Sequence, residues 1–197
     1  MSLADEVVER SLADRQEQYG AELRALIEAT YRVIAATGEF APPVRAILAE
    51  AGLSNPAFYR HFRSKDELLL VMLDEGRRQL AEYLDHRAAA ASGRDGKLEA
   101  WIRGVLAQAT DPEAASRTRP FFADTARLQA MFPEEQRRSE QLLVDQLADL
   151  LGDAAAAAST VYTLVFAVLG RHLLADEPPS EADIERVVAF ALAGIGA

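Results

Sequence analysis

The stretch from Ala41 to Leu70, APPVRAILAEAGLSNPAFYRHFRSKDELLL, constrains the fold of this chain more than any other part of the sequence. Val44 and Ile47 recur at helical spacing, and Gly52 follows as the residue type that commonly ends a helix in the left-handed conformation. Ser54 is a good N-cap for a second helix. We therefore predict two short helices across a tight turn, the geometry that places a second helix in the major groove of DNA.

The helix that follows Ser54 is predicted to have an inner and an outer side. Phe58 and Phe62 are four residues apart, so both point toward a core. The residues left on the outer side or near the helix start are Asn55, Ala57, Tyr59, Arg60 and His61. An earlier helix over residues 17–37, closed by Gly38, is expected to complete a small three-helix core.

The chain is acidic overall, but this stretch is not. The formal net charge is −10 over 197 residues. Residues 1–14 sum to −3 and residues 67–197 to −8, whereas residues 15–66 carry seven Lys or Arg against six Asp or Glu, a net of +1. Phosphate binding needs only a local basic patch, although the acidic remainder should weaken non-specific binding.

The remainder of the chain is predicted to be helical. A long helix begins after its N-cap Ser64, and the low-complexity segment 88–97 is the clearest loop. Further helices are expected over residues 97–110, 113–130, 133–151, 153–175 and 180–194. The predicted class is all-α, with a flexible acidic tail or a loose helical extension at residues 1–14, a helix-turn-helix head at 15–66 and a helical domain at 67–197.

Several functional classes have little support in the sequence. There is no cysteine, which excludes disulfides and thiol chemistry and fits a cytoplasmic location. The three histidines, His61, His86 and His172, are far apart, and no metal-binding or Gly-rich phosphate motif is found, so we expect no enzyme activity, metal or cofactor. The longest apolar run, Ala154 to Leu169, contains Ser and Thr, so we do not expect a membrane span.

The run AGLSNPAFYRHFRSKDELL, with Arg45 upstream, resembles the TetR-type one-component transcriptional regulators. The resemblance of the motif covers roughly residues 20–70, and that of the architecture covers nearly the whole chain. It implies a DNA-binding head joined by a long helix to a C-terminal ligand-binding and dimerisation domain. The implied function is a repressor that binds a pseudo-palindromic operator as a homodimer and is released by a small apolar or aromatic effector.

The resemblance also implies which residues contact DNA. The expected base contacts come from Arg45, Asn55, Ala57 and Arg60, and the expected phosphate contacts come from Ser54, Tyr59, His61 and Lys65. Each also has a structural interpretation: Tyr59 could cover the edge of the core, and His61 could satisfy a local hydrogen bond. Two residues depart from the family pattern, because Pro43 replaces a usual hydroxyl residue and Leu48 a usual Ala.

A ligand pocket and a dimer interface are expected in the C-terminal domain. The pocket candidates are Trp101, Phe121, Phe122, Arg127, Met131, Tyr162, Phe166 and His172. The dimer candidates, from the last two helices, are Val161, Val165, Val168, Val188, Ala189 and Leu192. For both groups the alternative interpretation is ordinary hydrophobic core. An alternative for the whole chain is a helical protein-interaction module that has lost sequence-specific DNA binding, which the acidic balance, Pro43 and Leu48 would fit.

Overall fold

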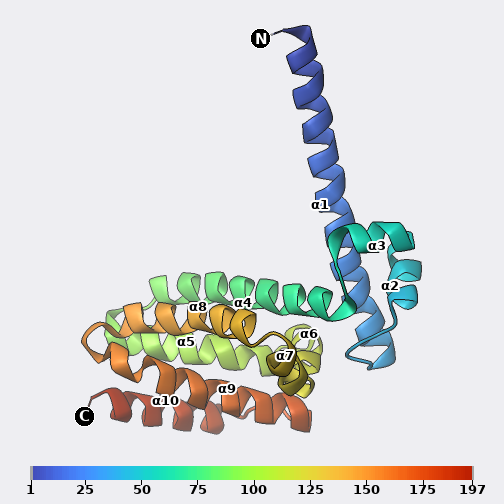
Figure 1. The fold of residues 1–197 in the computed structure, drawn as a ribbon. Coiled ribbons are helices and arrows are strands. Elements are labelled where there is room, and N and C mark those ends of the chain that lie inside the picture. The colour runs from blue at the N-terminus through green and yellow to red at the C-terminus, as the bar shows by residue number, and fades with distance from the viewer. Residues whose placement is uncertain (1, 197) are drawn as a thin grey trace. The chain divides into compact units, whose positions relative to one another are not determined.

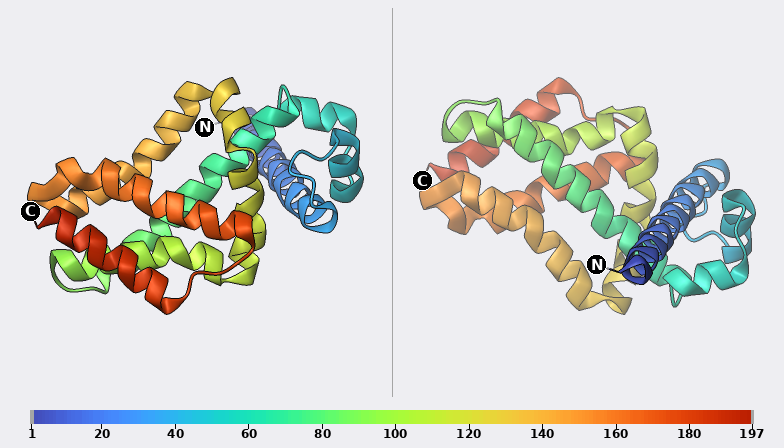
Figure 2. Two further views of the ribbon diagram at one scale, coloured as in Figure 1. Left: turned by 90° about the horizontal axis from the view of Figure 1, so that it is seen from below. Right: turned by 90° about the horizontal axis from the view of Figure 1, so that it is seen from above.

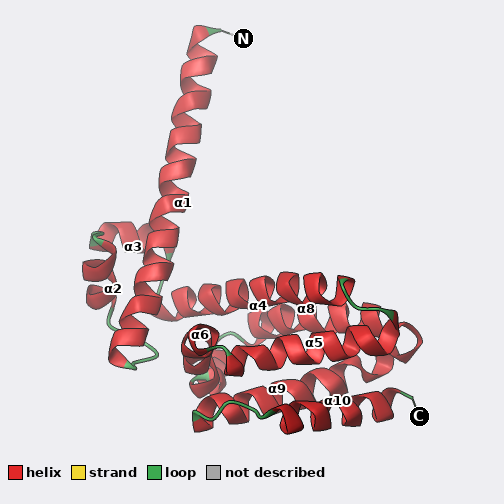
Figure 3. Ribbon diagram, turned by 180° about the vertical axis from the view of Figure 1, so that it is seen from behind, coloured by secondary structure: helices red, strands yellow, loops and turns green. Residues whose placement is uncertain are grey.

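The structure, a computed structural model, describes residues 2–196, apart from the side chains of Ala4, Glu6 and Val7. Over these residues it consists of helices and loops, as the all-α prediction requires (Figure 3). The first helices are α1 (Leu3–Thr37), α2 (Val44–Ala51), α3 (Asn55–His61) and α4 (Lys65–Ala89). They are followed by α5 (Gly93–Thr110), α6 (Pro112–Ala123), α7 (Thr125–Met131), α8 (Pro133–Leu151), the 3-10 helix η1 (Gly152–Ala157), α9 (Ala158–Ala175) and α10 (Glu181–Ile195).

The chain divides into two compact units between Leu69 and Leu70. The N-terminal unit contains α1, α2, α3 and the first residues of α4. The C-terminal unit contains the remainder of α4 and all later helices (Figure 1). Because α4 has no break, one continuous helix belongs to both units.

The N-terminal unit is held together by apolar side chains from each of its helices. The buried residues are Leu26, Ala29, Ile34, Ile47, Leu48, Ala57, Phe58, Phe62, Leu68 and Leu69. Gly38 and Gly52 end α1 and α2 at φ values of 70° and 66°, which confirms the predicted left-handed caps. Phe58 and Phe62 are 0% and 3% exposed, so both face inward as predicted.

Helix α1 begins earlier than the sequence analysis placed it. Residues 3–14, expected as a flexible tail or a loose helical extension, continue the helix expected at 17–37; Met1 lies outside the described residues. A capping box explains the early start, because Asp5 N donates to Ser2 Oγ and Ser2 N donates to the Asp5 carboxylate. This first part of α1 extends beyond α2 and α3 (Figure 1). Leu3, Val8 and Leu12 are exposed on it.

The C-terminal unit is built around α5. Leu98, Trp101, Ile102, Val105 and Leu106 are all fully buried at helical spacing, so α5 presents one wide apolar face to the core. Helices α6, α8, α9 and α10 each pack against it. Helix α10 lies on an outer face of this unit, in front when the molecule is viewed from below (Figure 2).

Three boundaries in the C-terminal unit differ from the predicted ones. The helix expected at 113–130 is two helices, because Asp124 leaves the helical conformation at φ −118° and ψ 16°. The loop expected at 88–97 is shorter, since α5 begins at Gly93. The helix expected at 153–175 begins later: residues 152–157 form η1 after Gly152 takes φ 57°, and α9 begins at Ala158. The helix expected at 180–194 is α10, and Ser180 and Asp183 form a capping box at its start.

Candidate functional site

The exposed side of α3 is the candidate nucleic-acid interface. Ala57, Phe58 and Phe62 are buried, and the His61 side chain is 0% exposed. The exposed arc of α3 therefore consists of Asn55, Pro56, Tyr59 and Arg60, with exposed Ser54 at the N-cap. The turn that precedes Ser54 joins α3 to α2, which is the helix-turn-helix arrangement expected from the sequence.

Four of the predicted DNA-contacting residues are exposed as such a role requires. They are Arg45 on α2 and Ser54, Asn55 and Tyr59 at α3. The Tyr59 side chain does not cover the core edge, since the residue is 63% exposed. The Ser54 hydroxyl makes no capping hydrogen bond, contrary to expectation, so it is free to bind another acceptor or donor.

Two other candidates are positioned differently from the expected role. Ala57 is 3% exposed, so its methyl group packs in the core of the unit and is turned away from the outer surface. Lys65 donates from Nζ to the carbonyl oxygen of Ala41 at 2.7 Å, which ties the start of α4 to the segment before α2. An ammonium group has two further donors, so this bond leaves Lys65 able to contact a phosphate.

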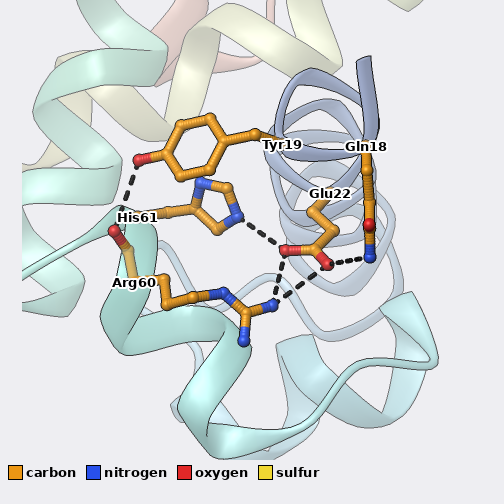
Figure 4. Close-up of polar contacts among 5 residues, drawn as sticks. All are labelled: Gln18, Tyr19, Glu22, Arg60 and His61. Carbon is orange, nitrogen blue, oxygen red and sulfur yellow. Dashed lines mark hydrogen bonds and ion pairs between the residues drawn. The ribbon is translucent and has the colours of Figure 1, made fainter. Parts of the chain in front are cut away.

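The remaining two candidates, Arg60 and His61, both contact Glu22 of α1 (Figure 4). Arg60 Nη2 donates to Glu22 Oε1 at 3.0 Å and to Oε2 at 2.8 Å. His61 Nε2 lies 3.0 Å from Glu22 Oε2, and Gln18 Nε2 donates to Oε1 at 3.3 Å. Hydrogen bonds from Arg60 and His61 lower the pKa of Glu22 from 4.5 to about 2.

The ionised state of Glu22 decides the tautomer of His61. A carboxylate only accepts hydrogen bonds, so Nε2 of His61 must carry the proton that it shares with Glu22. The other ring nitrogen, Nδ1, is buried and has no partner among the described residues. His61 therefore satisfies a local hydrogen bond, the alternative interpretation above, and is not turned toward a phosphate.

Tyr19 completes the contact between α1 and the end of α3. Its ring lies on that of His61 with centroids 4.0 Å apart, and its hydroxyl donates to the Arg60 carbonyl oxygen at 3.3 Å. This bond satisfies one of the carbonyl groups that the last turn of a helix leaves free. We call these residues, Gln18, Tyr19, Glu22, Arg60 and His61, the Glu22 cluster.

A second set of polar residues lies inside the C-terminal unit. Arg77 of α4 donates from Nη1 to Gln136 Oε1 at 2.9 Å, and its Nη2 lies 3.2 Å from Glu140 Oε1. Tyr162 of α9 is electrostatically coupled to Arg77 and Glu140, and burial raises the pKa of Tyr162 to about 12. We call Arg77, Gln136, Glu140 and Tyr162 the Arg77 cluster.

An aromatic stack continues from Tyr162. Its ring centroid is 4.3 Å from that of Phe166, and Phe166 is 6.5 Å from Phe122 of α6, both in stacked orientation. Two buried polar groups on α8, Gln136 Nε2 and Ser139 Oγ, have no hydrogen-bond partner within the described chain. Buried groups without partners are uncommon and mark positions where a further molecule can bind.

The structure brings together only part of the predicted pocket. Phe122, Tyr162 and Phe166 share the stack just described, whereas Trp101 and Phe121 are buried in the core. Arg127 and Met131 are exposed on α7, and His172 bonds through Nδ1 to the Glu177 carbonyl oxygen at the end of α9.

The dimer candidates also divide into two groups. Val161, Val165 and Val188 are 4%, 0% and 6% exposed, so they form core within one chain and do not face outward. Val168 and Leu192 are half-buried and Ala189 is exposed. Phe190, which the sequence analysis did not select, is 68% exposed next to Ala189.

Sequence reasoning did not select four polar residues of these sites, although the helical pattern contains a signal for each: Glu22, Arg77, Gln136 and Ser139. Glu22 extends the apolar stripe of Leu26 and Ala29, four residues before Leu26. Arg77 stands between Leu73 and Leu80 on the stripe of α4, and Gln136 and Ser139 continue the stripe of Leu143. A polar residue at an apolar position of a helical repeat indicates either that the helix face is assigned wrongly or that the residue makes a buried polar contact.

Together, the helix-turn-helix unit with an exposed second helix and the separate all-helical unit define a helix-turn-helix transcriptional regulator. Residues 26–72 match the sequence profile described as bacterial regulatory proteins, tetR family. The helix-turn-helix part of this chain, residues 26–72, is therefore of the tetR-family type.

Solved structures with the same fold include regulators from three bacteria. SCO4454, a TetR-family transcriptional regulator from Streptomyces coelicolor, is 22% identical with a TM-score of 0.62, covering 100% of this chain and 93% of its own. NemR from E. coli, in its reduced form, is 15% identical with a TM-score of 0.68, and the match covers 86% of this chain and 94% of the NemR chain. The fatty acid degradation regulator FadR from Bacillus halodurans is 17% identical with a TM-score of 0.62, and the match covers 88% of this chain and 94% of the FadR chain.

Proposed function

We propose that this chain is a cytoplasmic, ligand-responsive repressor that binds a pseudo-palindromic operator as a homodimer. The observation that carries the proposal is the exposed arc of α3, on which Asn55, Tyr59 and Arg60 point outward from a buried apolar side. Asn suits the N6 and N7 edge of adenine, and Arg suits the O6 and N7 edge of guanine. Tyr59 and Ser54 supply hydroxyl groups for phosphates, which set the register on the duplex.

The homodimer is proposed to form through α9 and α10. The most apolar helical window between Pro133 and Ala175 has a mean hydropathy of 1.5, yet only 22% of it is buried within one chain. By length and composition alone this stretch could also cross a membrane, but η1 interrupts it at Gly152–Ala157. A second copy of the chain would cover the outward residues, Val168, Ala189, Phe190 and Leu192.

The effector is proposed to be a small apolar or aromatic molecule that carries a hydrogen-bond acceptor. The stack of Phe122, Phe166 and Tyr162 offers an apolar surface in the C-terminal unit. The Gln136 amide and the Ser139 hydroxyl offer buried donors without partners. Ligand sites typically combine an apolar lining with a few such polar groups.

Helix α4 is the proposed connection between effector and DNA. It carries Lys65 at its first residue and Arg77 three turns later, within one unbroken helix. A ligand that changes the contacts of Arg77 would change the spacing of the two DNA-binding heads, which must match successive major grooves about 34 to 36 Å apart. By linkage, DNA must then weaken effector binding by the same factor.

Selection of bound duplexes from a random DNA pool tests the proposal. The purified full chain should enrich a palindromic duplex, and its affinity for that duplex should fall steeply as salt rises, because bound cations are released from the phosphates. Failure to enrich any duplex at low salt would contradict the proposal and favour the helical protein-interaction module.

A further inference from the structure

Arg60 occupies a special position on α3. The exposed arc of this helix runs from Asn55 through Tyr59 to Arg60, and Arg60 is at the edge of the arc that faces α1. Its side chain is 53% exposed although it is fixed to Glu22, whose side chain is 14% exposed. The guanidinium is therefore both held in place and accessible.

The hydrogen bonds of Arg60 leave specific donors free. A guanidinium has five N–H groups, and here Nη2 alone contacts the two Glu22 oxygens. Nε–H and the two N–H groups of Nη1 donate to no group among the described residues, so these donors remain available. These N–H groups can donate hydrogen bonds to acceptors such as O6 or N7 of guanine or a phosphate oxygen.

Glu22 is itself held firmly. It receives hydrogen bonds from Gln18 and His61 as well as from Arg60, and the His61 ring is packed against Tyr19. A long arginine side chain normally loses much conformational freedom when it binds. Because the Glu22 cluster has already restricted Arg60, less freedom remains to be lost on contact with DNA.

We propose that Glu22 of α1 is a positioning residue for DNA binding, which orients Arg60 so that its free guanidinium N–H groups contact acceptor oxygens or nitrogens of the duplex. This inference rests on the proposed DNA-binding function. It makes α1 part of the recognition apparatus, although Glu22 carries the charge that DNA repels.

The direction in which Glu22→Gln changes the affinity for DNA distinguishes a positioning role from plain repulsion between Glu22 and the phosphates. Removal of a carboxylate near the DNA surface should by itself raise the affinity for every duplex. If Glu22 positions Arg60, Glu22→Gln should instead lower the affinity for the duplex selected from the random pool, on the order of fivefold to tenfold. Glu17→Gln is the matched control, because Glu17 is exposed on the same helix and its substitution removes the same negative charge.

The measurement is fluorescence anisotropy with the selected duplex and with a shuffled duplex of the same length. A loss for the selected duplex alone places Arg60 on a base edge, and an equal loss for both places it on a phosphate. Equal gains for Glu22→Gln and Glu17→Gln would overturn the proposal. A gain for Glu22→Gln beyond that of the control would also overturn it, since Glu22 would then be withholding Arg60 from DNA.

A double-mutant cycle tests whether Glu22 acts through Arg60. Arg60→Gln should lower the affinity by itself, and Glu22→Gln should then cause no further loss. Arg60 is half exposed, so Arg60→Gln also provides a test if Glu22→Gln proves too unstable. An unchanged affinity in Arg60→Gln, or an undiminished Glu22 effect in its background, would overturn the inference. A wild-type chain that binds neither duplex would contradict the proposed function itself.

Discussion

The ring of Phe122 on α6 occupies the space that Gly170 leaves open on α9. A Cβ atom at Gly170 would lie 2.7 Å from Cδ1 of Phe122 and 3.0 Å from Cε1. Because Phe122 also stacks on Phe166, its ring cannot move away without loss of that contact. The packing of α6 against α9 thus depends on the absence of a single methyl group.

We expect Gly170→Ala to destabilise the C-terminal unit. The clash should cost about 1 to 3 kcal/mol, against a gain of up to about 1 kcal/mol from helix propensity. Gly76→Ala is the matched control, since nothing lies within 4 Å of a Cβ at this position in α4, and it should be neutral or stabilising. Urea denaturation of both variants checks this. An equal free energy of unfolding in the two variants would show that the Phe122 ring moves aside without cost.

The Glu22 cluster predicts a defined pH dependence of stability. The folded-state pKa of Glu22 is about 2, below its ordinary value of 4.5, so folding favours the ionised carboxylate. The contribution of ionised Glu22 to the free energy of unfolding should be complete above pH 4.5 and should disappear as the pH falls toward 2. The difference in melting temperature between wild type and Glu22→Gln should therefore shrink over this range. A difference that stays constant would contradict the role given to ionised Glu22.

The unpaired Ser139 hydroxyl predicts that Ser139→Ala costs no stability in the ligand-free protein. The substitution removes no hydrogen bond, because Oγ is buried without a partner. Gln146→Leu provides the contrast, since Gln146 accepts from Trp101 Nε1 at 3.1 Å and donates to the Ala81 carbonyl oxygen at 2.8 Å. We expect that variant to lose about 2 to 4 kcal/mol in urea denaturation. A comparable loss in Ser139→Ala would mean that Oγ is bonded.

Asn55 and Tyr59 should differ in their effects on DNA binding. Asn55→Ala should change the preferred base at one position of each half-site, because an amide reads a base edge. Tyr59→Phe should weaken all duplexes about equally, since a phosphate contact carries no sequence information. Repetition of the duplex selection with each variant distinguishes the two effects, and the reverse pattern would exchange their roles.

The proposed dimer predicts a strong effect at Phe190. This residue is 68% exposed on α10, and in a two-fold interface Phe190→Glu places like charges near each other. Sedimentation velocity at micromolar concentration should show a dimer for wild type and a monomer for the variant. Leu142→Glu, at a position 37% exposed on α8, should remain dimeric. A dimeric Phe190→Glu would exclude this face as the interface.

Much of the N-terminal unit could be predicted from local sequence. Gly38 and Gly52 set the ends of α1 and α2, and the spacing of Phe58 and Phe62 sets the buried side of α3. These features depend on residues close together in the chain, so backbone preference and helical periodicity are sufficient. The break at Asp124 was missed because the residues on both sides of it have continuous helical character.

The candidate sites depended on contacts that periodicity does not encode. Ala57 and His61 belong to the predicted motif, yet packing against the core and against Glu22 turns them inward. Val161 and Val165 match an interface pattern equally well, and only the packing of α9 on α5 shows that they are core.

The sequence by itself determined the all-α class, the two-helix turn and the residue types available for DNA contact. Only the tertiary structure decided that Glu22 meets Arg60 and that Arg77 meets Gln136. The reason is physical: a helical repeat specifies which side of a helix is buried, whereas the partner of a polar side chain depends on where a distant helix is packed.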